Sequence, residues 1–188
     1  MGMTRTAVEV EDELLVLGAQ AGDVRALGAL YARWHVRLGR HASRLVGDPD
    51  AAGDIAQEAW LAIARSIRRL DDPARFRAWA YRIVTRRAAD WIRKARRDRR
   101  LGEDLANDVE VNRQAVAEQD SEADDMELIR RALKALPPDR RALLALYYFD
   151  ELTVAEIAEA LAIPKGTVKS RLHHARNHLK HALERNRT

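Results

Sequence analysis

The chain has 188 residues, which is enough for one medium domain or two small ones. Hydrophobic residues make up 47% of it and charged residues 33%, a balance that excludes a wholly disordered protein. Cysteine is absent, which excludes disulfides, cysteine-bound zinc and thiol catalysis. The N-terminus has no apolar signal region, and no apolar stretch approaches the roughly eighteen residues of a membrane-spanning helix. We therefore expect a cytoplasmic protein with no membrane insertion.

The net charge of +4 is distributed unevenly along the chain. Residues 86–100 contain eight Lys or Arg and two Asp, residues 101–127 contain ten Asp or Glu and one Arg, and residues 128–188 contain twelve Lys or Arg and six Asp or Glu. Basic segments bind polyanions such as nucleic acid, and an acidic segment avoids them. The pattern indicates two polyanion-binding lobes on either side of an acidic linker.

Good helix formers dominate the composition. Ala, Leu, Arg and Glu are frequent, and no segment alternates Val, Ile or Thr with polar residues. The sequence therefore predicts an all-α fold of two small helical domains joined by a flexible acidic linker. We expect the first domain over residues 11–100, the linker over residues 101–125 and the second domain over residues 126–186.

Apolar residues recur at helical spacing in three segments of the first domain. The first ten residues carry no such pattern, and we expect a frayed terminus there. One helix is predicted over about residues 27–45, and a second over about residues 51–67, after a stop and a cap at residues 48–50. A third follows Asp72 as N-cap, with Pro73 at its first position. Their apolar faces predict one shared core.

The linker and the second domain contain five further predicted helices. The acidic linker lacks clear periodicity apart from a short helix around residues 111–119. Beyond it, helices are predicted over residues 126–136, over residues 138–149 after a double proline, over residues 154–161, and over about residues 167–184.

The last two predicted helices form a helix-turn-helix. Thr153 and Glu156 form a capping box at the start of the first one. In the second, Val168, Leu172 and Ala175 share an apolar face, and the opposite face is polar. The first turn of such a helix enters the major groove, where short side chains reach base edges. The candidate DNA-contacting residues are Lys165, Thr167, Lys169, Ser170, Arg171, His173, His174 and Arg176. The alternative is an amphipathic helix that merely closes a small bundle.

The third helix carries a basic stripe opposite its apolar face, here called the arginine ridge. A basic ridge of this kind follows a phosphate backbone, and nearby Trp79, Tyr81 and Trp91 offer rings for stacking on unpaired bases. Core packing is the alternative role for these rings, and a solvated face is the alternative for the arginines. The ridge consists of Arg75, Arg82, Arg86, Arg93, Arg97 and Arg100, widened by Arg87 and Lys94. The charged loop at residues 68–75 is either a base-holding loop or a plain connector.

Asp54, Gln57 and Glu58 share one face of the second helix because they are three and four residues apart. Two carboxylates and an amide do not attract DNA, but they suit a basic protein partner. An ordinary exposed acidic face is the alternative interpretation.

The order of these elements resembles that of the extracytoplasmic-function (ECF) sigma factors, a group of the sigma-70 family of bacterial RNA polymerase subunits. Residues 54–60 (DIAQEAW) resemble region 2.2 of that family, and residues 76–83 (FRAWAYRI), with Asp90 and the arginines after it, resemble regions 2.3 and 2.4. Three motifs resemble region 4, namely LPPDRR at 136–141, ELTVAEIA at 151–158 and PKGTVKSRL at 164–172.

The resemblance implies a role for each lobe. Asp54, Gln57 and Glu58 would dock on the β′ clamp helices of core RNA polymerase, and the protein would also contact the β flap. The third helix and the loop before it would read and help melt the −10 element, and the final helix would read the −35 element as duplex. The −10 candidates are Arg75, Trp79, Arg82, Arg86, Arg87, Arg93 and Lys94. An anti-sigma factor is an expected partner, and neither catalysis nor a cofactor is expected.

Two residues depart from the family pattern. Arg86 stands where the family often has Asn, at a position that helps to read the −10 element, and Gly53 stands where the family often has an acidic residue. Both departures point to divergent specificity.

Two other functions remain open from the sequence. A dimeric helix-turn-helix repressor or activator would use the second domain, but it would leave the arginine ridge and the acidic face without a role. A metal site would use His174, His178 and His181, which recur at helical spacing but have no obvious further ligand.

Overall fold

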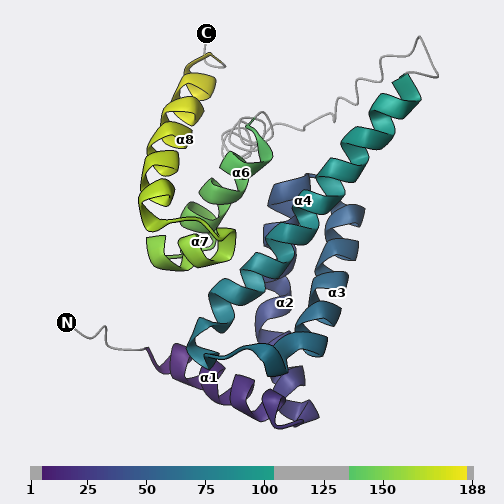
Figure 1. Ribbon diagram of the computed structural model, residues 1–188, viewed down its shortest axis with the longest axis vertical. Coiled ribbons are helices and arrows are strands. Elements are labelled where there is room, and N and C mark those ends of the chain that lie inside the picture. Colours follow the sequence, from purple (N-terminus) through teal and green to yellow (C-terminus); the bar gives the residue numbers. More distant parts are fainter. Residues whose placement is uncertain (1–5, 104–135, 186–188) are drawn as a thin grey trace, which may run out of the picture.

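The computed structural model describes residues 6–103 and 136–185, with the backbone alone at residues 100–103 and 178–185 (Figure 1). The predicted linker and nearly all of the predicted helix at residues 126–136 lie outside this part of the chain. No strand occurs within the described residues, and the prediction of an all-α fold is confirmed.

The described helices form two lobes. The N-terminal lobe consists of α1 (Ala7–Gln20), α2 (Val24–Val46), α3 (Pro49–Ser66) and α4 (Phe76–Glu103). The C-terminal lobe consists of α6 (Pro138–Leu144), a π-helical turn (Ala145–Phe149), α7 (Val154–Leu161) and α8 (Lys165–Arg185). None of the described helices is long and apolar enough to cross a membrane.

The helix boundaries follow local capping chemistry. Asp48 and Asp72 each accept a hydrogen bond at 3.0 Å from a backbone amide two or three residues ahead. Asp72 is therefore a cap as predicted, and the cap predicted within residues 48–50 is Asp48. Pro73, however, begins a short 3-10 turn (Pro73–Arg75), and α4 itself begins at Phe76. At the end of α2, Gly47 adopts a left-handed φ of 73°, which glycine permits at little cost.

The helix α1 was missed, and the prediction of a frayed terminus is wrong for residues 7–10. A capping box starts this helix: the Thr6 hydroxyl accepts from the Glu9 amide at 3.3 Å, and the Glu9 carboxylate accepts from the Thr6 amide at 2.8 Å. At the other end, the Gln20 side chain donates to the backbone carbonyls of Ile67 and Leu70, which ties α1 to the connection between α3 and α4.

The core of the N-terminal lobe lies between α2, α3 and α4. Trp34 stands edge-on to Phe76 and Tyr81, with ring centroids 5.7 and 6.3 Å apart. Aliphatic side chains, fully buried, fill the space around these rings: Leu30, Leu38, Ile63 and Val84. Burying each such side chain contributes about 1.5–3 kcal/mol, so packing of this face holds the predicted three-helix core together.

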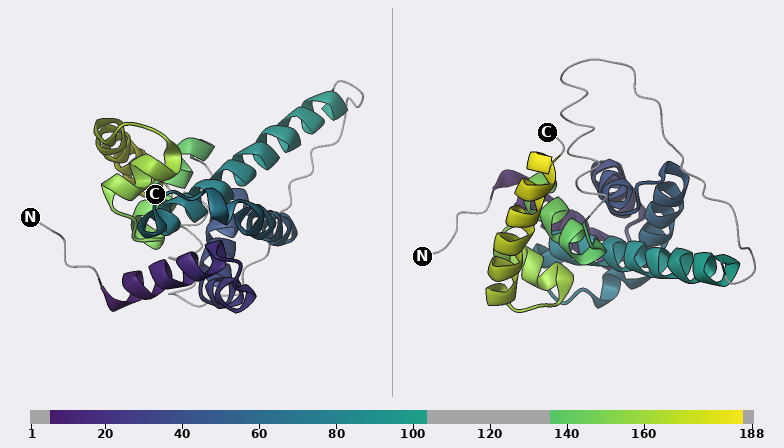
Figure 2. Two further views of the ribbon diagram at one scale, coloured as in Figure 1. Left: turned by 60° about the horizontal axis from the view of Figure 1, so that its bottom comes forward. Right: turned by 90° about the horizontal axis from the view of Figure 1, so that it is seen from above.

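The two lobes pack against each other, chiefly through α4 and α7 (Figures 1 and 2). Arg141 of α6 also donates to the backbone carbonyl of Leu45 at the end of α2, at 2.7 Å. We call this arrangement the closed form, because side chains of both lobes are buried where they meet.

Candidate nucleic-acid interface

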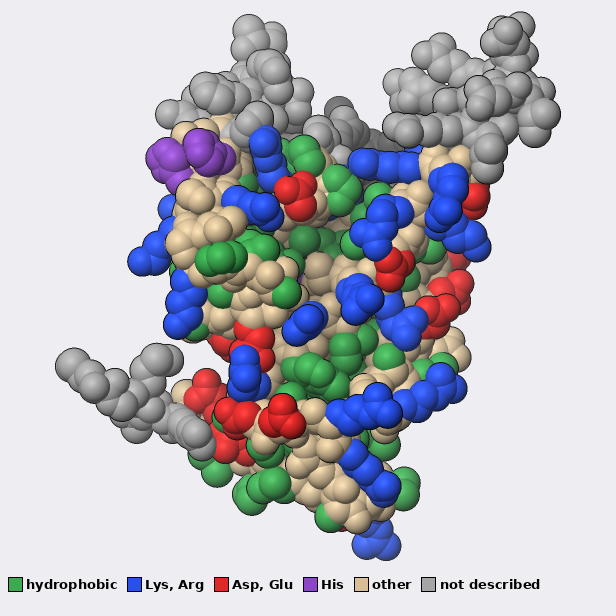
Figure 3. Space-filling model, in the orientation of Figure 1, with side chains coloured by type: hydrophobic (Ala, Val, Ile, Leu, Met, Phe, Trp, Pro, Cys, Tyr) green, Lys and Arg blue, Asp and Glu red, His purple; other side chains and the backbone are tan. Residues whose placement is uncertain are grey.

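The arginine ridge is exposed along α4. Arg75, Arg82, Arg86 and Arg93 are all exposed, as are Lys94 and Arg97, whereas the Arg100 side chain lies outside the described residues. Figure 3 shows Lys and Arg side chains gathered over the C-terminal half of α4. The spacing of the arginines therefore produces a continuous basic face, which is suited to a phosphate backbone.

The aromatic residues of α4 differ from one another in exposure. Tyr81 is 2% exposed and belongs to the core, so the interpretation of it as a base-stacking ring is wrong for this arrangement and the alternative of core packing holds. Trp79 and Trp91 are half-buried and pack against the edge of the core. Trp79 lies beside Phe76, with ring centroids 6.1 Å apart, and keeps part of its ring accessible.

The helix-turn-helix is built as the sequence predicts. Thr153 caps α7 through the predicted capping box with Glu156. Ala162 ends α7 with a left-handed φ of 53°, and α8 begins at Lys165, two residues before the predicted start. Its apolar face, Val168, Leu172 and Ala175, is buried.

The polar face of α8 carries the predicted DNA contacts. Thr167 is half-buried, and the other predicted residues of this face are exposed: Lys165, Lys169, Ser170, Arg171, His173, His174 and Arg176. Arg176 also lies over the rings of Tyr147 and Tyr148, at 5.3 and 5.7 Å from their centroids, a contact that spacing alone did not reveal.

The acidic face of α3 is exposed and touches the arginine ridge. Asp54, Gln57 and Glu58 all reach solvent, and Glu58 accepts a hydrogen bond from Arg87 of α4 at 2.6 Å. Beside this face, Gln57 and Tyr31 line a groove of about 620 Å³ between α2 and α3. The acidic face therefore borders an apolar groove that could receive a protein side chain.

Acidic residues of α7 cover the start of the arginine ridge. Arg75 pairs with Glu159 at 2.8 Å, and the hydrogen bond and charge of that carboxylate raise the pKa of Arg75. Arg77 lies 3.5 Å from Glu156. In the closed form two cations at the start of α4 are thus engaged by carboxylates of the C-terminal lobe.

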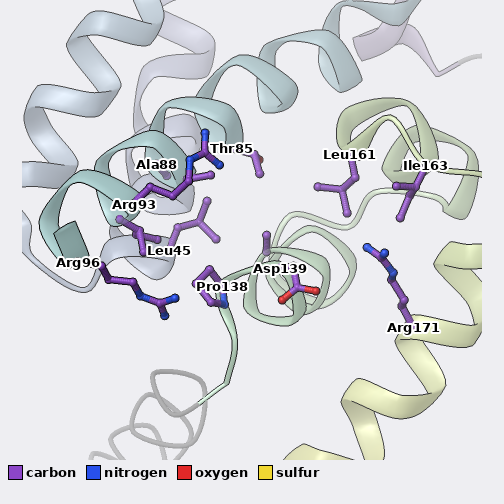
Figure 4. Close-up of a pocket in the computed structure, with 13 residues that line it drawn as sticks. Leu45, Thr85, Ala88, Arg93, Arg96, Pro138, Asp139, Leu161, Ile163 and Arg171 are labelled. Carbon is purple, nitrogen blue, oxygen red and sulfur yellow. The ribbon is translucent and has the colours of Figure 1, made fainter. Parts of the chain in front are cut away.

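A cavity of about 360 Å³ lies between the lobes (Figure 4). Apolar side chains such as Leu45 and Leu161 come from opposite sides of it, and Arg93 and Arg96 of α4 line it together with Arg171 of α8. The two predicted DNA-binding helices therefore both contribute cations to the lining of the same cavity.

The sequence interpretation missed a buried polar cluster, which we call the Asp150 cradle: His41, Arg44, Arg77 and Tyr81 around Asp150. His41 Nδ1 lies 2.6 Å from Oδ2 of Asp150, and Oδ1 accepts hydrogen bonds from Arg44 at 3.0 Å and from Tyr81 at 3.3 Å. Arg77 donates to the Asp150 backbone carbonyl at 2.5 Å. Burial, together with the Asp150 charge, raises the pKa of Tyr81. No short motif marks this cluster, because Asp150 lies 69 to 109 residues along the chain from the side chains that surround it.

The comparisons with known proteins identify the family. The family model "Sigma-70 region 2" matches residues 30–98, and "Sigma-70, region 4" matches residues 126–179. The ECF RNA polymerase sigma factor SigW of Bacillus subtilis is 34% identical over 170 residues, covering 86% of this chain and 91% of SigW. SigL of Mycobacterium tuberculosis, another ECF sigma factor, is also 34% identical over 170 residues, covering 90% and 95%.

Solved structures share the fold. CnrH in complex with the cytosolic domain of CnrY superposes with a TM-score of 0.70 at 23% identity, covering 93% of this chain and 97% of CnrH. RpoE of Bartonella quintana, in complex with the anti-sigma factor NepR, gives 0.69 at 21% identity, covering 86% and 98%. From the sequence matches, this chain belongs to the ECF sigma factors of the sigma-70 family.

Proposed function

We propose that this sigma factor directs transcription initiation by binding two promoter elements, one with each lobe, while it is held on core RNA polymerase. In this proposal α8 reads the −35 element as duplex, and α4 with the loop before it reads and helps melt the −10 element. The observation that carries the proposal is that each lobe presents its own exposed basic helix. A repressor that used the helix-turn-helix alone would have no use for the ridge on α4.

Binding of unpaired bases by the protein would supply the free energy for melting the promoter DNA. Unpairing DNA costs a few kcal/mol per flipped base, and stacking of an unpaired base on an aromatic ring returns about 1–3 kcal/mol. Trp79 is half-buried and lies four residues from Arg75, so ring and cation would act on neighbouring nucleotides. The protein would contribute binding sites without catalysis or a cofactor, and the polymerase would carry out the chemistry.

Docking on the polymerase would use the acidic face of α3. Asp54, Gln57 and Glu58 would meet the β′ clamp helices, and the adjacent groove at Tyr31 would take an apolar side chain of that partner. Charge complementarity of this kind fixes the orientation of a complex and speeds its formation. The C-terminal lobe would contact the β flap.

An anti-sigma factor is the regulator that we propose. The fold is shared with CnrH and RpoE, whose structures were solved in complex with CnrY and with the anti-sigma factor NepR. Such a partner would hold the two lobes away from DNA and polymerase.

Run-off transcription on a library of randomised promoters, with and without this protein, tests the proposal. Transcripts that require both core polymerase and the protein, and that share two spaced elements, are expected. Arg171→Gln should alter the selected −35 sequence, whereas Arg25→Gln, a matched change at the start of α2, should not. Duplex binding without any polymerase-dependent transcript would instead support the repressor.

A further inference from the structure

Every polar group of the Asp150 cradle that donates a hydrogen bond belongs to the N-terminal lobe, and the acceptors belong to the C-terminal lobe. His41 and Arg44 come from α2, and Tyr81 and Arg77 come from α4. The carboxylate and backbone carbonyl of Asp150 accept all four contacts. The cradle is therefore an anion-binding site of one lobe, filled by a side chain of the other.

Packing within the N-terminal lobe fixes the orientation of two of the donors, His41 and Tyr81. An ionised carboxylate only accepts, so His41 Nδ1 carries the proton that points at Asp150, and Nε2 lies 2.9 Å from the Thr85 hydroxyl. The ring of Tyr81 stands edge-on to the His41 ring, with centroids 5.0 Å apart. These contacts lie within the N-terminal lobe and do not depend on Asp150, so His41 and Tyr81 stay arranged when Asp150 leaves.

The N-terminal lobe contributes the permanent positive charges of the cradle, and the C-terminal lobe contributes the carboxylates. Arg44 and Arg77 are permanent cations, and the carboxylates that face them are Asp150 and, at 3.5 Å from Arg77, Glu156. Both carboxylates belong to the C-terminal lobe. Separation of the lobes therefore leaves two arginines and a histidine around a vacant anion position.

The proposed function requires that separation. The 25 base pairs between positions −35 and −10 span about 85 Å at 3.4 Å per pair. In the closed form, α4 and α7 are in contact and Arg75 is paired with Glu159. The two lobes therefore cannot bind the two promoter elements at the same time until they move apart, and that movement opens the cradle.

We propose that His41, Arg44, Arg77 and Tyr81 form a phosphate-binding site, which takes a phosphodiester of single-stranded promoter DNA in the open form and is filled by Asp150 in the closed form. A phosphodiester presents two non-bridging oxygens and one negative charge, as the carboxylate of Asp150 does. Arg77 lies two residues after Arg75, at the end of the loop proposed to hold an extruded base, so the site adjoins the path of the melted strand. This inference rests on the proposed function.

Two variants with opposite expected effects test the inference. A fluorescein-labelled twelve-nucleotide single strand is titrated with the full chain at several KCl concentrations, and binding is followed by anisotropy. Asp150→Asn removes the competing carboxylate, and we expect roughly tenfold tighter binding with a salt slope steeper by about 0.7, the value of one phosphate contact to a single strand. Arg44→Gln removes a phosphate ligand, and we expect binding no tighter than that of the unmodified chain.

The different strand affinities expected for Asp150→Asn and Arg44→Gln distinguish a phosphate site from a contact that only holds the lobes together. If Arg44 only held the lobes together, Arg44→Gln would open them and strengthen binding as Asp150→Asn does, and that result would overturn the inference. In the Asp150→Asn background, Arg44→Gln should remove the added salt slope. Arg25→Gln, about five turns earlier on α2, should leave it unchanged.

Three further measurements identify the ligand and show whether a failure concerns this inference or the proposed function. Millimolar inorganic phosphate should weaken strand binding to Asp150→Asn more than chloride of equal ionic strength; equal effects would contradict a specific phosphate site. Arg44→Lys, which keeps the charge and the fold, should retain part of the added slope, and its complete loss would also count against the site. Run-off transcription that is absent for every variant would refute the proposed function, whereas normal transcription with tighter strand binding by Arg44→Gln would refute this inference alone.

Discussion

His41 Nδ1 of α2 lies 2.6 Å from Oδ2 of Asp150, across the boundary between the two lobes and 109 residues away in sequence. The His41 side chain is fully buried, and that of Asp150 is 3% exposed. A buried charge is retained only where it is paired. This contact therefore requires the C-terminal lobe to keep its position against α2. The closed form therefore depends on one carboxylate of the C-terminal lobe.

Substitution of that carboxylate should loosen the closed form. Removal of one partner of a buried ion pair costs about 3–5 kcal/mol, because the remaining charge loses its compensation. We expect Asp150→Ala to increase the radius of gyration in small-angle X-ray scattering while circular dichroism still reports helix. Glu151→Ala, at the exposed neighbouring position, is the matched control. A radius unchanged by Asp150→Ala would mean that the packing of α4 on α7 suffices to hold the lobes together.

Loss of the helix-turn-helix cap should destabilise the C-terminal lobe. Thr153 supplies the hydroxyl of the capping box at α7, and replacing a capping Thr by Ala costs about 1 kcal/mol. Thr153→Ala should lower the free energy of unfolding by that amount in urea denaturation, and Thr153→Ser should restore most of it. Equal stability of the Ala and Ser variants would show that the cap contributes nothing measurable.

The acidic face of α3 should determine polymerase affinity without supporting the fold. Glu58 is exposed and pairs with Arg87 at the surface, where such pairs contribute about 0–1 kcal/mol. Asp54→Asn combined with Glu58→Gln should therefore leave the melting temperature nearly unchanged and weaken binding to immobilised core polymerase at least fivefold. Asp71→Asn, in the loop before α4, serves as a control for an exposed acidic residue outside that face. Equal polymerase affinity of the α3 variant and this control would remove the proposed docking role.

Arg86 is exposed on α4 and stands where the family often has Asn. We expect Arg86→Asn to change the −10 sequence selected from the randomised library, because an amide pairs with different base edges than a guanidinium does. The −35 sequence should stay the same, since α8 belongs to the other lobe. A −10 preference identical to that of the unmodified protein would show that Arg86 reads no base.

Sequence patterns predicted most of the local structure. The apolar stripes located α2, α3 and α8, and the capping signals at Asp48, Asp72 and Thr153 marked helix starts that the structure contains. The missed helix α1 had a signal of the same kind, since Thr6 and Glu9 form a capping box. Short-range chemistry of this sort depends on residues within one turn and is therefore visible in the sequence.

The relation between the lobes was not predictable in this way. The cradle brings His41 and Arg77 to Asp150, and Arg93 and Arg171 line the same cavity. These residues are so far apart in the sequence that no periodic pattern relates them. The sequence leaves Tyr81 open to base stacking or to core packing, because an aromatic residue near arginines suits either role. Its burial depends on which face of α4 packs against α2, and that is a property of the tertiary structure.

The buried hydroxyl of Tyr81 should make stability depend on alkaline pH. Burial and the nearby Asp150 charge raise its pKa above the ordinary value of about 10, so the folded protein holds this proton after the unfolded chain has released it. The contribution is complete below about pH 10 and is lost as the pH rises further toward the folded pKa, because the unfolded state then binds fewer protons. The free energy of unfolding should therefore fall above pH 10, and Tyr81→Phe should reduce that fall. Tyr148→Phe, at a half-exposed ring, should leave that fall unchanged. If the free energy of unfolding falls equally above pH 10 in Tyr81→Phe and in the unmodified protein, the Tyr81 hydroxyl is not buried in solution.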